Sequence, residues 1–184
     1  MDKATLRRES LTTLKALSPE DRARLSQAIN KTLTQHPAVA NAHTIAVFDP
    51  LPTEPDLNPF IDHLRSTRPD TQVAYPRCHD DHLHFHLVAS TKNLFPVPNR
   101  RFREPNPETC PHIDPTTLDL ILVPGLAFSP TSLARLGRGG GYYDRLLATP
   151  NLSATTIGIA FPCQLQESIP TDPHDQTVMS LVTA

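Results

Sequence analysis

The sequence has only three cysteines, few glycines and no long hydrophobic run. Cys78, Cys110 and Cys163 are an odd number without a CxxC spacing, so they indicate neither a disulfide framework nor a zinc knuckle. No stretch approaches the ~20 apolar residues of a membrane span, and the first residues lack the apolar segment of a signal peptide. We therefore expect a soluble, cytoplasmic protein without a membrane partner.

An excess of charge of one sign is also lacking, because 17 lysines and arginines face 19 aspartates and glutamates, with a formal net charge of −2. This balance creates no general attraction to nucleic acid, so we expect no nucleic-acid partner. The length of 184 residues, with 38% hydrophobic residues, suits one domain with a buried core. We expect residues 1–184 to form that single domain.

The few glycines are concentrated in one stretch, from Arg135 to Asp144. It holds four of the six glycines, namely Gly137, Gly139, Gly140 and Gly141. A glycine loses much conformational entropy on folding, but it allows unusual φ values and lets backbone N–H groups approach a ligand closely. The stretch therefore predicts a place where the backbone contacts an anion such as phosphate. A glycine-rich turn with exposed arginines is the alternative interpretation.

Known nucleotide-binding motifs do not match this stretch. GxxxxGK[ST] is absent, and GxGxxG fails because Tyr142 stands where the third glycine is needed. A position after a buried strand and before a helix still suits phosphate, because a helix N-terminus carries a partial positive charge. Arg135 and Arg138 can hold a phosphate through paired N–H groups, and Asp144 can reach a magnesium ion bound to it. Together these residues predict that the protein handles ATP.

The rest of the sequence predicts alternating helices and strands. We expect helices over residues 3–17, from Ser18 through Leu33, from Asp56 through Leu64 and over 142–148, and strands at 44–48, 72–75 ending at Pro76, 118–123, 155–161 and 178–183. Residues 95–115 contain six prolines and predict an extended connection on the surface. This order predicts an α/β fold with a mostly parallel central sheet flanked by helices.

Two polar patterns have ordinary explanations beside functional ones. Lys3 and Arg7 stand four residues apart and share a helix face, which is usually a solvated face. His82, His84 and His86 alternate with apolar residues, so one strand face would carry only histidine. Such a face can bind zinc, but an exposed edge strand explains the alternation equally well without a metal.

Several motifs together resemble a known family, the 5-formyltetrahydrofolate cyclo-ligases, also called methenyltetrahydrofolate synthetases. The motifs are Val123-Pro-Gly-Leu-Ala-Phe128, Arg135-Leu-Gly-Arg-Gly-Gly-Gly-Tyr-Tyr-Asp144, Lys3-Ala-Thr-Leu-Arg7, the loop from Leu51 to Asp56, and Arg103-Glu-Pro105. The resemblance spans nearly the whole chain. It implies a Rossmann-like fold related to those of phosphosugar isomerases and CoA-transferases.

The resemblance also implies roles for individual residues. The implied ATP-binding residues are Lys3, Ala4, Thr5, Leu6, Arg7, Arg135, Leu136, Gly137, Arg138, Gly139, Gly140, Gly141, Tyr142 and Tyr143. The implied folate-binding residues are Leu51, Glu54, Asp56, Arg138, Gly139, Gly140, Gly141 and Tyr142. Asp144 and Asp175 would hold Mg²⁺, and Lys3 and Arg138 would act in catalysis.

The implied reaction converts 5-formyltetrahydrofolate to 5,10-methenyltetrahydrofolate through a phosphorylated formyl group, with release of ADP and phosphate. The implied partner is a reduced folate, with or without a polyglutamate tail, and the protein would be a monomer. The chain departs from the usual family pattern over Ser129–Ala134 and at Met179. A non-catalytic binder of nucleotide or folate and a phosphosugar isomerase-like enzyme are the alternatives, because fold alone does not determine function.

Overall fold

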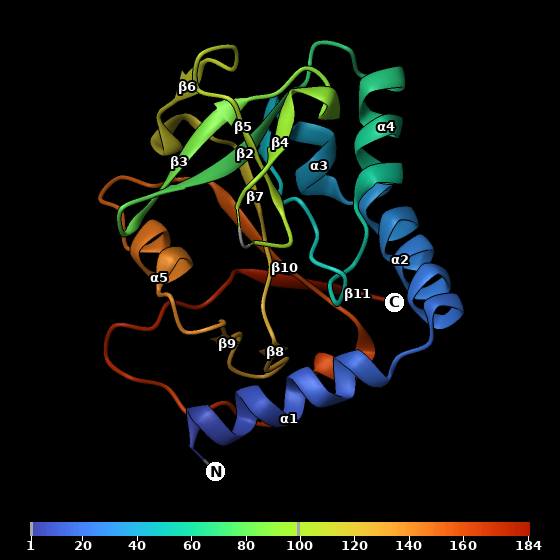
Figure 1. Cartoon of the computed structure of the whole chain (residues 1–184), viewed down its shortest axis with the longest axis vertical. Coiled ribbons are helices and arrows are strands. Elements are labelled where there is room, and N and C mark those ends of the chain that lie inside the picture. Colours follow the sequence, from blue (N-terminus) through green and yellow to red (C-terminus); the bar gives the residue numbers. More distant parts are fainter. Residues whose placement is uncertain (1, 99) are drawn as a thin grey trace.

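A seven-stranded sheet forms the centre of the computed structural model, which describes residues 2–98 and 100–184 (Figure 1). The sheet order is β11 (Ser180–Thr183), β10 (Thr155–Ala160), β7 (Leu120–Val123), β1 (Thr44–Ala46), β2 (Gln72–His79), β3 (His82–Leu87) and β6 (His112–Ile113). The strands from β11 to β2 in this order run parallel, and β3 and β6 extend the sheet by antiparallel pairing. The predicted α/β fold with a mostly parallel sheet is therefore confirmed.

Both faces of the central strands are buried, and side-chain alternation assigns each residue to one face. Ile45 and Val47 pack in one core, while Ala46 between them packs in the other. The first core is covered by α2 (Pro19–Thr34), α3 (Pro37–Asn41) and α4 (Asn58–Thr67), which group together in Figure 1. The second core is covered by α5 (Tyr142–Leu147) and Phe128. Burial on both faces explains why these strands read as continuous apolar runs.

Short elements connect the main ones. β4 (Leu94–Pro96) pairs with β5 (Arg103–Pro105), β8 (Ala127–Phe128) pairs with β9 (Arg135–Leu136), and 3-10 turns span η1 (Thr91–Asn93), η2 (Pro115–Thr117) and η3 (Pro162–Gln164). The extended connection predicted over 95–115 contains the short strands β5 and β6, which are themselves extended, and Pro96 and Pro105 stand at the ends of β4 and β5. β6 pairs with β3 at Phe85 and His86, so the exposed-edge interpretation does not apply to His86, whereas it stays open for His82 and His84 outside this pairing.

The predicted end of a strand at Pro76 is wrong, since β2 continues to His79. Proline lacks an N–H group and is excluded where a neighbouring strand needs that donor. On the side of β2 that faces β1, the pairing ends at Ala74, so no strand requires a donor from Pro76. The other side continues to pair with β3 as far as His79. The tertiary arrangement therefore tolerates a proline that local propensity disfavours.

Two capped helices open the chain. α1 (Lys3–Ala16) begins after Asp2, and α2 begins after Ser18, whose Oγ accepts a hydrogen bond from the Asp21 N–H at 3.0 Å. The predicted serine cap is thus confirmed, and such a cap stabilises a helix by about 1 kcal/mol. Leu6 of α1 packs against Leu136, which brings the start of α1 beside β8 and β9 (Figure 1). No helix in the described part of the chain is both long and apolar enough to cross a membrane.

Candidate functional site

The sheet changes direction between β1 and β7, and a cleft opens there. The chain continues from β1 to β2 on one side, whereas β7 leads to β10 on the other. Loops that leave two such strands diverge at the carboxyl ends, which is the usual ligand position in α/β sheets. The cleft has a volume of about 480 Å³, and its floor includes Phe48 and Asp49 after β1 and Pro124 and Gly125 after β7.

This cleft brings together most of the residues predicted from the sequence, although they come from distant segments. The predicted residues that line it are Lys3, Arg7, Leu51, Glu54, Asp144, Asp175 and all nine residues from Arg135 to Tyr143. Lys3 and Arg7 therefore face a cavity, so the solvated-face interpretation is not needed for them. Whether these residues bind the expected ligands remains a prediction.

Four predicted residues do not line the cleft. Ala4 is exposed, the Thr5 N–H bonds to the capping Asp2, and Leu6 is buried in the core, because helical periodicity turns all three away from Lys3 and Arg7. Asp56 is exposed, and its Oδ1 accepts hydrogen bonds from the backbone and side chain of Asn58 at the start of α4. These contacts hold Asp56 against the first residue of α4, one position before the N-cap residue Leu57.

The glycine stretch adopts a backbone that only glycine enters easily. Gly139 has φ 104° and Gly141 has φ 68°, both in the left-handed region. Gly141 is also the N-cap of α5, and a Cβ added to it would lie 2.6 Å from Nη1 of Arg145. α5 has only six residues, so its dipole contributes less to the site than the sequence suggested.

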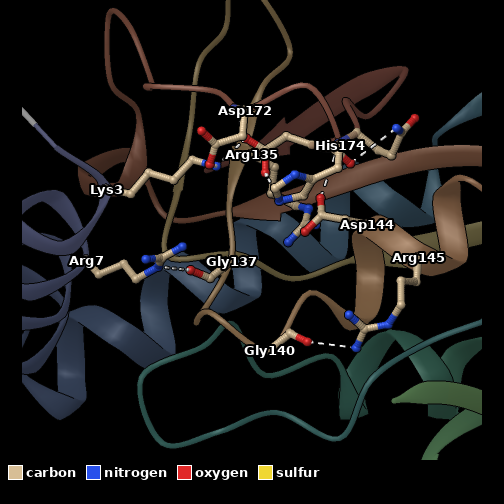
Figure 2. Close-up of polar contacts among 11 residues, drawn as sticks. Lys3, Arg7, Arg135, Gly137, Gly140, Asp144, Arg145, Asp172 and His174 are labelled. Carbon is tan, nitrogen blue, oxygen red and sulfur yellow. Dashed lines mark hydrogen bonds and ion pairs between the residues drawn. The ribbon is translucent and has the colours of Figure 1, made fainter.

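Arg145, which was not predicted from the sequence, holds the glycine stretch in place through hydrogen bonds. Its Nη2 donates to the Gly140 carbonyl at 2.8 Å (Figure 2). Its Nε donates to the Asp81 carbonyl at 2.5 Å. The guanidinium also lies over the Tyr142 ring, 5.3 Å from the centroid, and the Tyr142 hydroxyl donates to the Asp80 carbonyl at 3.3 Å. The turn between β2 and β3 thus holds the loop in place.

We expect Arg145→Ala to weaken ATP binding on the order of tenfold, because it removes two hydrogen bonds of about 1 kcal/mol each that orient the loop. Isothermal titration calorimetry with ATP measures the change. Arg24→Ala removes an exposed arginine on α2 and serves as the control. Equal ATP affinities of Arg145→Ala and the unchanged protein would remove Arg145 from the positioning role.

Arg138 joins the glycine stretch to the loop after β1. Its Nη2 donates to Glu54 Oε1 and to Thr53 Oγ1, both at 3.1 Å. Glu54 is 7% exposed, and its Oε2 accepts a hydrogen bond from the Leu51 N–H at 3.0 Å. Burial raises the pKa of Glu54 above its ordinary value, although the Leu51 N–H and Arg138 oppose this. Arg138 therefore favours the ionised form of Glu54.

Arg135 and Asp144 form an ion pair in the wall of the cleft. Arg135 Nη2 lies 2.8 Å from Asp144 Oδ1, and the side chains are 3% and 17% exposed. A Cβ at Gly137 would come within 2.8 Å of Arg135 Nη1, so glycine leaves the space that this side chain needs. The Gln176 N–H also donates to Asp144 Oδ1 at 3.2 Å. Asp144 therefore lies beside the loop that carries Asp175.

The start of α1 closes another side of the cleft. Arg7 Nε donates to the Gly137 carbonyl at 3.0 Å, and Lys3 Nζ forms ion pairs with Asp175 and with Asp172, the latter at 2.7 Å (Figure 2). Asp172 and His174 also line the cleft, and ligand atoms of Asp172, His174 and Asp175 lie within 4.8 Å of one another. Asp172 and His174 were not predicted from the sequence, although their position beside Asp175 was a signal.

A second arginine–carboxylate pair was also missed. Asp49 directly follows the β1 run, and its carboxylate accepts from Arg103 N at 2.7 Å and Arg103 Nη2 at 2.6 Å. These residues are 54 positions apart, and their pairing draws Arg100 and Phe102 to the cleft. An aspartate at the carboxyl end of a buried strand was the available signal, because polar residues at that place often face a ligand.

The unusual segment from Ser129 to Ala134 forms the turn between β8 and β9. Ser129 is 0% exposed, its N–H donates to the Ala134 carbonyl at 2.9 Å, and its Oγ donates to the Glu167 carbonyl at 3.2 Å. Leu133 takes a positive φ of 57°. The unusual residues are therefore accommodated within the turn, and Arg135 pairs with Phe128 across β8 and β9.

Comparison with known sequences identifies relatives along the whole chain. The model of the 5-formyltetrahydrofolate cyclo-ligase family matches residues 1–184. The chain is 32% identical over 174 residues to the 5-formyltetrahydrofolate cyclo-ligase of Escherichia coli strain K12, a match that covers 92% of this chain and 93% of the relative. It is 28% identical over 184 residues to the 5-formyltetrahydrofolate cyclo-ligase of Mus musculus, covering 96% and 90%.

Solved structures give the same result. The NMR structure of 5,10-methenyltetrahydrofolate synthetase from Aquifex aeolicus matches with a TM-score of 0.84 and 31% identity, covering 99% of this chain and 89% of that chain. A 5,10-methenyltetrahydrofolate synthetase from Mycoplasma pneumoniae matches with a TM-score of 0.79 and 27% identity, covering 100% and 99%. The chain therefore belongs to the 5-formyltetrahydrofolate cyclo-ligase family.

Proposed function

We propose that this protein catalyses the ATP-dependent ring closure of 5-formyltetrahydrofolate to 5,10-methenyltetrahydrofolate, with release of ADP and phosphate. The observation that carries the proposal is a single cleft of about 480 Å³ that contains both the glycine stretch and the loop after β1. Small-molecule sites commonly have volumes of about 300–1,000 Å³. Two substrates that must react with each other can therefore meet in this cleft.

The proposed ATP site is the wall made by α1 and the glycine stretch. Lys3, Arg7 and Arg138 offer cationic donors there. Gly139 and Gly141, which have positive φ values, carry no side chain that would keep a phosphate away from the loop backbone. Such donors suit the phosphate oxygens of a nucleotide. Lys3 is already paired with Asp172 and Asp175, so binding of a phosphate would exchange these partners.

The proposed folate site lies across the cleft, where Phe48, Leu83 and Phe102 offer apolar surface and Glu54 offers a buried carboxylate. Aromatic and aliphatic side chains suit the flat pterin ring, and a carboxylate can accept hydrogen bonds from its amino and imino groups. Arg100 and Arg103 add positive charge for the glutamate tail, whether single or extended. Arg138 lies between the two halves because it contacts Glu54 and belongs to the glycine stretch.

The chemistry explains why ATP is needed. The formamide oxygen is a poor leaving group, so it first attacks the γ-phosphorus of ATP, and the bond from phosphorus to the ADP oxygen breaks. N10 then attacks the carbon of the resulting iminium phosphate, phosphate leaves with the former formyl oxygen, and the N10 proton passes to solvent. Lys3 and Arg138 stabilise the negative charge on the transferred group, and the loop amides hold its position.

Mg²⁺ is the metal that this donor set suits. Asp144 and Asp175 supply hard oxygen ligands, and Asp144 Oδ2 and Asp175 Oδ1 accept no hydrogen bond within the described residues. The ammonium group of Lys3 beside Asp175 indicates that this corner attracts a cation. A bound magnesium ion would neutralise phosphate charge, and Asp144 and Asp175 would hold it in reach of the glycine stretch.

The oligomeric state, the cellular location and the form of the folate are proposed as the sequence suggests. We propose that the protein acts as a monomer. The reducing cytoplasm suits the free Cys78, Cys110 and Cys163. We also retain a reduced folate, with or without additional glutamates, as the substrate.

One assay tests the proposed function. Purified protein is mixed with ATP, Mg²⁺ and 5-formyltetrahydrofolate, and the near-ultraviolet absorbance of the methenyl product is followed, with omission of ATP as the control. We expect product only when ATP is present. Absence of ATP-dependent product would overturn the proposal, and binding of both ligands without turnover would instead favour the non-catalytic binder.

A further inference from the structure

A row of histidines on β2, β3 and β6 takes no part in the cleft. Leu83 of β3 lines the cleft and packs in the second core, so its neighbours His84 and His86 lie on the opposite face of the strand. His112 on β6 pairs directly with His86 across the two strands. β3 and β6 lie at the end of the molecule remote from α1 (Figure 1). The tertiary structure therefore adds a histidine 26 positions beyond His86 to the sequence pattern.

The spacing of the rings suits a shared metal ion. The centroids of His86 and His112 lie 5.5 Å apart, and those of His84 and His112 lie 5.8 Å apart. Two imidazoles that bind one tetrahedral zinc ion have centroids about 5 Å apart, because each Zn–N bond is about 2.1 Å. Within the described residues the three rings do not form a preassembled metal cluster, so side-chain rotations must direct a nitrogen of each ring to one point. His112 occupies the middle of the three.

A hydrogen bond to Nδ1 selects the tautomer of His86 that a metal ligand needs. Its Nδ1 lies 2.8 Å from the Cys110 carbonyl oxygen, which can only accept, so Nδ1 carries the proton and Nε2 keeps its lone pair in the neutral ring. Metal-binding histidines commonly donate their other nitrogen to a backbone carbonyl in this way. His86 is 5% exposed, yet within the described residues its Nε2 is neither hydrogen-bonded nor enclosed.

We infer that His84, His86 and His112 form a binding site for a divalent transition-metal ion that prefers imidazole ligands, with zinc as the representative ion. Three imidazoles and one water complete a tetrahedral zinc site. The ion would add a link between the two-residue strand β6 and β3, which pair through Phe85, His86, His112 and Ile113. This site is separate from the cleft, and the inference does not depend on the proposed function.

Calorimetric titration of the metal-free full chain with ZnCl₂ tests the site. We expect one equivalent to bind with a dissociation constant in the micromolar range and to raise the melting temperature, because a ligand that binds only the native state stabilises it. His112→Gln should weaken zinc binding at least about tenfold. His112 is exposed, so its replacement leaves the core intact, and melting without zinc checks this.

Two control variants make the test specific. His43→Gln removes an exposed histidine elsewhere and should leave zinc binding unchanged. His174→Gln alters the cluster of Asp172, His174 and Asp175 at the cleft and should also leave it unchanged. Loss of zinc binding in His174→Gln but not in His112→Gln would overturn the inference, and so would the absence of any zinc binding by the unchanged chain.

Discussion

Arg138→Ala should lower kcat/KM for the ATP-dependent cyclisation by about 10²–10³-fold, the loss typical of one group that stabilises charge in a transition state. Arg138 joins the two proposed ligand sites, and its side chain is 38% exposed and therefore able to contact a ligand. Its Nη2 also lies 3.1 Å from Glu54 Oε1. Steady-state kinetics in both substrates measures the fall. Wild-type kcat/KM in the variant would place Arg138 outside the chemistry.

The same variant should change the pH dependence of activity. Burial already raises the pKa of Glu54, and Arg138 is one of the groups that oppose this rise. Without Arg138 the pKa of Glu54 rises further, so Glu54 becomes protonated at a higher pH as the pH falls. If the reaction uses the ionised form of Glu54, the acid limb of the kcat/KM profile therefore moves to higher pH. Arg8→Ala, an exposed residue on α1, should move neither the rate nor the acid limb.

Asp144→Asn should raise the magnesium concentration required for half-maximal ATP binding by about 10–100-fold. The amide has the same shape but lacks the negative charge that a magnesium ligand provides. The variant should also lower the free energy of unfolding by about 1–3 kcal/mol, because the buried Arg135 keeps its charge but loses its charged partner. ATP titrations at several magnesium concentrations and chemical denaturation measure the two effects.

A second variant separates the two effects of Asp144→Asn. Arg135→Gln breaks the same ion pair but keeps the Asp144 carboxylate, so it should retain magnesium-dependent ATP binding better than Asp144→Asn does. Asp70→Asn, on an exposed turn, controls for the loss of a surface charge and should change neither quantity. An unchanged magnesium requirement in Asp144→Asn would exclude Asp144 as a metal ligand.

Local features of the fold were predictable because neighbouring residues decide them. Ser18 has a side chain that caps a helix directly, and Gly139 and Gly141 adopt the positive φ that glycine permits. The apolar run before Pro124 predicted the buried strand β7 because few other structures bury so many adjacent apolar residues. These predictions needed no knowledge of the rest of the chain.

Other features depended on partners that the local sequence does not reveal. Pro76 remains within β2 because β1 ends beside it, and the pairing of β3 with β6 depends on the path of residues 95–115. The Asp56 carboxylate accepts the Asn58 N–H at the start of α4, a contact that the sequence pattern did not indicate. The Asp49–Arg103 pair joins residues 54 positions apart, which no periodic pattern indicates.

The sequence by itself determined the α/β class, the resemblance to the family and the glycine stretch as the central candidate site, because each rests on patterns within short segments. Only the tertiary structure decided which cations and carboxylates meet in the cleft, that Arg145 fastens the loop, and that His112 joins the histidines of β3. The physical reason is that these contacts join distant segments, and strand order and loop paths, rather than local propensity, bring such segments together.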